Sequence, residues 1–147
     1  IRVYLDRSFF TLVLSEMPVD KKIKILLDSE NIWNNNRFTV ENIGFDDHLH
    51  SDEKLFFILS RDKFKEGISI RKWKSGDRIL LSPNGIFKKV SKIFIDYKIP
   101  LLNKNNYPIV VDNMDNILWI PGIRYGALKD NIGSSQQENY KIKWNKL

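Results

Sequence analysis

The chain contains no cysteine, which excludes disulfide bonds, thiolate metal ligands and a cysteine nucleophile. This absence suits a reducing compartment, so we expect a cytoplasmic protein. No apolar run approaches the roughly 20 residues that span a bilayer, so we expect a soluble chain without a membrane partner. The sequence starts at Ile1 instead of methionine and no signal segment follows, so we expect a fragment of a longer protein.

The excess of positive charge is confined to one part of the sequence. The 147 residues carry a net charge of +6, and residues 61–104 hold twelve Lys and Arg against four Asp and Glu. Residues 41–60 are acidic, with five carboxylates against one lysine. Such a local basic stretch favours an anionic partner, with nucleic acid the leading candidate. A solvated charged face is the alternative, and charge alone leaves both interpretations open.

Most of the sequence is typical of short strands, which predicts an α+β fold with a β-rich core and few helices. Apolar and β-branched residues cluster between turn signals. A hairpin is expected where residues 112–116 separate two apolar runs. Polar and apolar residues alternate over 22–25, as in a half-buried strand. However, Val19, Ile23, Leu26 and Leu27 also have the spacing of one helix face. The predicted strands are 2–5, 9–14, 22–25, 37–40, 55–61, 67–73, 77–81, 108–111 and 117–120.

One segment has helical periodicity. Val90, Ile93, Phe94 and Tyr97 recur at the spacing of one helix face, which predicts a helix over 88–98 that ends before Pro100. Lys88, Lys89 and Lys92 would then share the first turn of this helix. Unpaired N–H groups at a helix start bind phosphate, so we expect a phosphate contact there.

Three motifs between residues 70 and 124 carry a resemblance to a known family. The segment 70–78, IRKWKSGDR, is similar to the R-x-x-x-P-G-D entry of the C-terminal domain of tRNA(Ile)-lysidine synthetases. Residues 88–100, KKVSKIFIDYKIP, resemble that family's K-K-L-S-D-F-F-I-D-x-K-I-P helix. Residues 108–112 and 117–124 resemble its P-L-L-V-D and I-x-W-V-P-G-x-R hairpin. Ser75 replaces the usual proline and Lys92 a usual aspartate.

The resemblance implies a β-sandwich related to a domain of the phenylalanyl-tRNA synthetase β chain. It implies that this part of the enzyme binds the acceptor stem of tRNA(Ile). A separate catalytic domain of the same polypeptide would use ATP and Mg²⁺ to convert the wobble cytidine to lysidine. The Ser-Gly-Gly-x-Asp-Ser phosphate loop of that domain does not occur here, so no catalytic residue and no cofactor are expected in this fragment.

The motifs and the basic stretch together define the candidate site. Trp73 and Trp119 are expected in the core, and Arg124 is expected near either RNA or Asp77. The residues expected to bind RNA are Arg71, Lys72, Lys74, Arg78, Lys88, Lys89, Ser91, Lys92 and Arg124. The residues expected to maintain the motif structure are Gly76, Asp77, Asp96, Pro100, Pro121 and Gly122.

Two other functions compete with this interpretation. His48 and His50 lie among carboxylates, and two histidines with this spacing could bind a divalent metal ion in a metal-dependent enzyme. A solvated acidic loop is the better interpretation of residues 46–53, so no bound metal ion is expected. A protein-interaction module without RNA contact is the second rival.

We divide the chain into a β-rich part at 1–66, the motif region at 67–128, and a polar segment with a C-terminal strand at 129–147.

Overall fold

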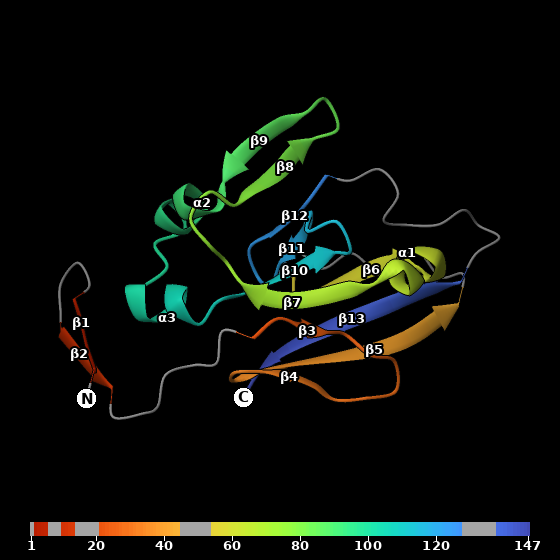
Figure 1. The fold of residues 1–147 in the computed structure, drawn as a ribbon, viewed down its shortest axis with the longest axis horizontal. Coiled ribbons are helices and arrows are strands. Elements are labelled where there is room, and N and C mark those ends of the chain that lie inside the picture. The colour runs from red at the N-terminus through yellow and green to blue at the C-terminus, as the bar shows by residue number, and fades with distance from the viewer. Residues whose placement is uncertain (1, 6–9, 14–20, 45–53, 128–137) are drawn as a thin grey trace.

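Two antiparallel β-sheets that pack face to face form the centre of the fold (Figure 1). The computed structural model describes residues 2–5, 10–13, 21–44, 54–127 and 138–147. One sheet has five strands in the order β12-β11-β10-β7-β3, and the other has four in the order β4-β5-β13-β6. The first contains β3 Ile23–Lys24, β7 Ile68–Lys72, β10 Pro108–Asp112, β11 Ile117–Ile120 and β12 Arg124–Tyr125. The second contains β4 Asn31–Trp33, β5 Asn36–Gly44, β6 Phe56–Ser60 and β13 Asn139–Lys146.

Aromatic side chains fill the core between the two sheets. Trp119 is fully buried there, as predicted, with its ring stacked on Phe57 at 5.9 Å and edge-on to Phe38 at 6.1 Å. Its indole nitrogen donates to the carbonyl oxygen of Lys54 at 3.0 Å, so burying the ring leaves no unpaired donor. This core joins residues from both sheets, which confirms the predicted sandwich-like arrangement.

A second core lies on the other face of the five-stranded sheet. Along β10, Val110 points into the first core, whereas Ile109 and Val111 point into the second. There they meet a layer made by the hairpin of β8 Arg78–Ser82 and β9 Ile86–Lys89 and by the helix α2 Val90–Asp96. Figure 1 shows this layer on the side of β10 away from β5 and β13. Burial on both faces explains why β10 and β11 are continuous apolar runs.

The predicted helix over 88–98 is shorter in the structure, because a strand occupies its first two residues. Lys88 and Lys89 pair with β8 in β9, and Lys89 is the extended residue before α2. The helix ends at Asp96. The N–H groups of Lys98 and Ile99 then bond back to the carbonyls of Ile95 and Phe94. With Lys98 at φ 54°, this is a Schellman ending, and it leaves Tyr97 exposed instead of on the buried face.

The predicted strands between residues 22 and 120 are all confirmed, and so is the hairpin across 112–116. The helical alternative at Ile23, Leu26 and Leu27 is wrong, because Ile23 pairs with Ile70 in the sheet, and Val19 lies outside the described residues. The sequence did not reveal β4, β9 and β12, or the short helices α1 Arg61–Glu66 and α3 Leu101–Asn105. No helix in the described ranges is long and apolar enough to cross a bilayer.

Strand pairing also joins distant parts of the chain. The predicted C-terminal strand is β13, which lies between β5 and β6, and β3 extends the sheet that contains β7. The first two predicted strands are confirmed as β1 Arg2–Leu5 and β2 Phe10–Val13, and they pair with each other. Residues 6–8, where Asp6-Arg7-Ser8 favours a turn between the two strands, lie outside the described residues, as does most of the polar segment 129–138. The three-part division of the chain stays a prediction.

Candidate nucleic-acid interface

A buried ion-pair cluster, here called the Arg71 clasp, holds the first motif together. Arg71 extends from β7 and is 8% exposed. Its Nη1 and Nη2 each donate to one carboxylate oxygen of Asp77 at 2.9 Å. Its Nε and Nη2 donate to Asp115 at 2.9 and 3.1 Å, and Nη1 also donates to the carbonyl of Lys72 at 3.0 Å. A guanidinium has five N–H donors, and all five are used here.

This geometry corrects the predicted role of Arg71. With no N–H left to donate to a phosphate, the residue serves the fold, and the RNA contact predicted from its charge is not available to it. Asp77 is placed as predicted, against a basic side chain and a backbone N–H. The sequence did not identify Asp115 as a partner, because that residue is 44 positions away in the β10–β11 turn.

Asp115 connects the clasp to two exposed lysines. Its carboxylate lies 3.7 Å from the Lys22 ammonium and 3.6 Å from that of Lys74. Partial burial alone would raise the pKa of Asp115, but the hydrogen bonds and charge of Arg71, with the charges of Lys22 and Lys74, lower it below its ordinary value. Burial likewise opposes the charged form of Arg71, yet Asp77 and Asp115 raise its pKa. Both partners are therefore ionised at neutral pH.

The clasp also fixes the turn that follows β7. Asp77 accepts a bond from the backbone N–H of Lys74 at 2.7 Å, and its own N–H donates to the Lys74 carbonyl. Gly76 lies at φ 94° in this turn, a conformation that favours glycine. The carbonyl of Asp77 then accepts from the N–H of Val90, the first residue of α2. The first two sequence motifs are thus physically joined at Asp77.

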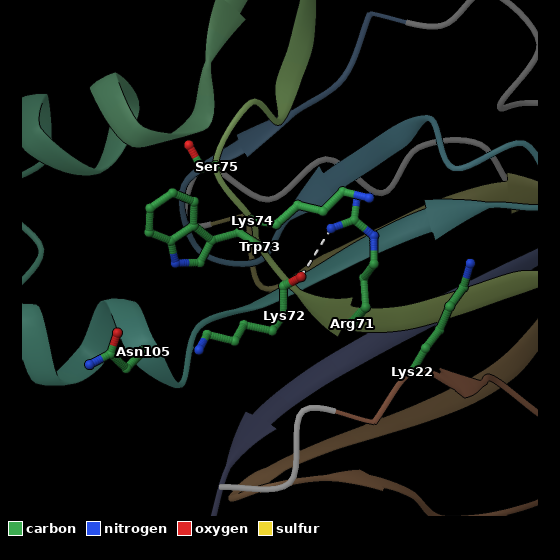
Figure 2. Close-up of a pocket in the computed structure, with 7 residues that line it drawn as sticks. All are labelled: Lys22, Arg71, Lys72, Trp73, Lys74, Ser75 and Asn105. Carbon is green, nitrogen blue, oxygen red and sulfur yellow. Dashed lines mark hydrogen bonds between the residues drawn. The ribbon is translucent and has the colours of Figure 1, made fainter.

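An open pocket of about 510 Å³ lies beside the clasp at the end of β7 (Figure 2). The Trp73 indole forms one side, with its Nε1 donating to the carbonyl of Lys104 and its ring packed edge-on against Phe94. This half-buried position agrees with the predicted packing role of Trp73. The pocket is lined by Lys22, Arg71, Lys72, Trp73, Lys74, Ser75 and Asn105.

The exposed face of the β8–β9 hairpin carries the second group of predicted cations. Ile79 of β8 is fully buried in the second core, so the residues that alternate with it point to solvent. Arg78 and Lys89 are directly opposite in the register and both exposed. Phe87 lies two residues before Lys89 on the same face, 54% exposed, with the Arg78 guanidinium 5.7 Å from its ring centre. We call Arg78, Phe87 and Lys89 the hairpin face.

Local sequence explains why the hairpin forms here. The chain reverses at Ser82-Pro83-Asn84-Gly85, where the Gly85 N–H donates to the Ser82 carbonyl at 3.1 Å. Gly85 lies at φ 88°, and the register shifts between Leu80 and Ser82 as in a bulged hairpin. Phe87 was not among the predicted site residues. Recognising 86–89 as a strand would have placed it on one face with Lys89.

The predicted gathering of three lysines on one helix turn does not occur. Lys88 belongs to β9, and its ammonium binds Asp96 at 2.6 Å. This hydrogen bond lowers the pKa of Asp96, which burial would slightly raise, with help from the charges of Lys88 and Lys92. Lys92 lies exposed in the first turn of α2, and Ser91 is half-buried beside it. The expected phosphate contact at the helix start therefore loses Lys88 and otherwise stays a prediction.

The third motif forms a tight corner at residues 121–124. Gly122 has φ 75°, and a β-carbon there would lie 2.9 Å from the Trp144 ring. The carbonyl of the buried Pro121 accepts the Tyr107 hydroxyl. Arg124 is half-buried in β12, and no ion pair between it and Asp77 occurs in the described part of the chain. The remaining motif residue, Pro100, is extended and precedes α3.

The rival metal site falls on residues 46–53, which include His48 and His50 and lie outside the described residues. Across the described ranges, no group of three or more His, Asp or Glu side chains is arranged to hold a metal ion.

Comparison with known proteins supports the motif resemblance. A family model described as the TilS substrate C-terminal domain matches residues 68–144, just over half of the chain. The tRNA(Ile)-lysidine synthase of Bacillus subtilis (strain 168) is 38% identical over 97 residues, which cover 66% of this chain and 21% of that protein. The tRNA(Ile)-lysidine synthase of Thermotoga maritima is 27% identical over 121 residues, 82% of this chain and 24% of that protein. The chain therefore spans about a fifth of the length of these relatives.

A solved structure supports the fold. The chain is similar to one described as the crystal structure of TILS C-terminal domain, with a TM-score of 0.72 and 24% sequence identity. The match covers 86% of this chain and 98% of the other. At this identity the likeness shows the shared β-sandwich architecture.

Proposed function

This chain belongs to the family of TilS substrate C-terminal domains, and from that premise we propose that it binds tRNA(Ile) through the acceptor stem. The larger protein would be a tRNA(Ile)-lysidine synthase, a carbon–nitrogen ligase of the cytoplasm. Its catalytic domain, elsewhere in the same polypeptide, would use ATP and Mg²⁺. This chain would bind and position the RNA without catalysing the reaction.

The observation that carries this proposal is the like-charged pair Arg78 and Lys89 on the hairpin face. Like charges directly opposite in a two-stranded sheet repel each other, at a cost of a few tenths of a kcal/mol. No carboxylate of the described residues forms an ion pair with either side chain. A bound phosphate would relieve the repulsion, because one anion can contact both cations.

The lysines beside the pocket add to this surface. Lys74 is the most exposed of them, with 66% of its side chain accessible, and its 3.6 Å contact with Asp115 is weak enough for solvent to screen. Lys22, Lys72 and Lys92 supply further positive charge on the described surface. Such contacts would hold the RNA backbone without reading its sequence, as phosphate contacts do.

The proposal is tested by measuring tRNA(Ile) affinity in a gel shift at several salt concentrations. For the wild-type chain, the logarithm of the association constant should fall with the logarithm of salt concentration. We expect Arg78→Glu with Lys89→Glu to weaken binding by tenfold or more and to reduce the salt slope by about two. Wild-type binding that is absent, or that does not weaken with salt, would contradict the proposal.

A charge-matched control separates a local contact from a change in net charge. Lys65 in α1 and Lys146 at the end of β13 are exposed and lie away from the hairpin (Figure 1). Lys65→Glu with Lys146→Glu alters the net charge by the same amount. We expect affinity close to wild type for this control, and an equal loss in both double variants would assign the effect to net charge alone.

A further inference from the structure

Phe87 is an aromatic residue whose position packing does not explain. Its ring is 54% exposed, although the fully buried Ile79 shows that the opposite face of the same hairpin has access to the core. On the solvent side, Phe87 lies diagonally across from Arg78 and two residues from Lys89. Both strands are paired backbone to backbone along this stretch, so the three side chains project from a fixed scaffold.

The surroundings of the ring are cationic. The Arg78 guanidinium lies over the ring at 5.7 Å, in a cation–π contact. With Lys89 on the same face, the aromatic surface is flanked by positive charge, and no carboxylate of the described residues forms an ion pair with Arg78 or Lys89. An exposed aromatic ring between basic side chains is how proteins bind unpaired nucleotides, with the base stacked on the ring and the phosphates held by the cations.

We propose that Phe87 is a stacking platform for an unpaired RNA base, with Arg78 and Lys89 contacting the phosphates beside that base. This inference rests on the proposed function, because it assumes that the chain binds tRNA. It adds an uncharged residue, Phe87, to the proposed contacts. It also specifies that the part of the tRNA bound by this residue is single-stranded.

The geometry favours an unpaired base over a paired one. Inside a duplex, both faces of each base are covered by its neighbours, so a side chain on a rigid strand cannot reach them. A base at the end of a stem or in a single strand has a free face. An acceptor stem carries unpaired nucleotides at its 3′ end, and these are the unpaired bases nearest to a protein that grips that stem.

The test uses two RNAs and four variants of the full chain. The RNAs are tRNA(Ile) and the same tRNA without its unpaired 3′ nucleotides. Phe87→Leu keeps an apolar side chain but removes the ring, Phe87→Ala removes both, and Phe87→Trp keeps an aromatic face. Ile86→Ala is the matched control, because Ile86 is the adjacent residue, is 57% exposed, and cannot stack.

For intact tRNA, we expect both Phe87→Leu and Phe87→Ala to weaken binding about tenfold, within the range for one stacked base. Phe87→Trp should bind like wild type or more tightly, and Ile86→Ala should bind like wild type. For the shortened tRNA, wild type and Phe87→Leu should bind equally. Thermal melting should show all four variants folded, since the altered side chains are exposed.

Three results would overturn the inference. Wild-type affinity in folded Phe87→Leu would show that the ring does not stack. An equal loss in Ile86→Ala would indicate a general apolar contact, as with a protein partner. A loss that persists with the shortened tRNA would place the ring elsewhere on the RNA. In each case salt-dependent binding by the wild-type chain would leave the proposed function intact, whereas wild-type protein that binds neither RNA would remove both.

Discussion

The Arg71 clasp and the hairpin face use the same residue types in opposite ways. In the clasp, one arginine meets two carboxylates and its five N–H donors are all occupied within the protein. On the hairpin face, Arg78 and Lys89 lie opposite each other with an exposed ring and no carboxylate partner among the described residues. Arg71 and Arg78 are seven positions apart in the sequence. Whether a cation supports the fold or remains free for a ligand is therefore set by its tertiary neighbours.

The comparison predicts the largest loss of stability for Arg71→Ala. Removing the guanidinium leaves Asp77, whose side chain is 7% exposed, as an uncompensated buried charge. We expect the free energy of unfolding to fall by about 3 kcal/mol. Urea denaturation would measure this, with Arg78→Ala as the control.

For Arg78→Ala we expect the free energy of unfolding to change by no more than about 0.5 kcal/mol, since the side chain is exposed. Equal losses in the two arginine variants would mean that the clasp and the hairpin face do not differ as described.

Gly122→Ala provides an uncharged counterpart to the clasp. The substitution adds a β-carbon at φ 75° and 2.9 Å from the Trp144 ring, so either the corner or the ring must shift. We expect a loss of about 2 kcal/mol in the free energy of unfolding, without a change in the tRNA affinity of the folded protein. Gly85 also has a positive φ, but open space surrounds it. Gly85→Ala should therefore lower the free energy of unfolding by less.

Asp115→Asn tests the clasp through pH. The folded protein lowers the pKa of Asp115, so its ionised form stabilises the fold above the ordinary pKa of about 3.9. That contribution is lost as pH falls through the lowered value. We expect the variant to be about 1 kcal/mol less stable at pH 7, with a smaller difference from wild type below pH 4.

Urea denaturation across this pH range measures the effect. Glu30→Gln is the control, since Glu30 is an exposed carboxylate in a 3.6 Å pair with Arg37. A difference between Asp115→Asn and wild type that stays constant down to pH 3 would contradict the role assigned to Asp115.

The smallest expected effect separates two adjacent lysines. Lys88 is bound to Asp96 at 2.6 Å, whereas Lys89 lies on the hairpin face. We expect Lys89→Ala to weaken tRNA binding by about three- to fivefold and Lys88→Ala to weaken it by less, with phosphate contacts as the cause. A gel shift at low salt measures both, and the reverse order would indicate that Lys88 leaves Asp96 to contact the RNA.

Sequence reasoning succeeded where one local signal decides the structure. The apolar runs of β10 and β11 and the turn between them predicted a hairpin, and the spacing of Val90, Ile93 and Phe94 predicted the buried face of α2. It was wrong at the start of α2, because pairing of Lys88 and Lys89 with β8 outweighed the helical pattern. It missed Phe87 for the same reason, since the face that a residue occupies depends on its secondary structure.

By itself, the sequence determined the family, the β-rich class and the concentration of positive charge between residues 61 and 104. These follow from motif order, residue periodicity and composition, which are properties of neighbours along the chain. Only the tertiary structure decided which cations are neutralised and which face solvent, because Asp115 reaches Arg71 across 44 positions and β9 pairs with β8 before α2 begins. Electrostatic pairing acts over a few ångströms in space and does not follow sequence distance.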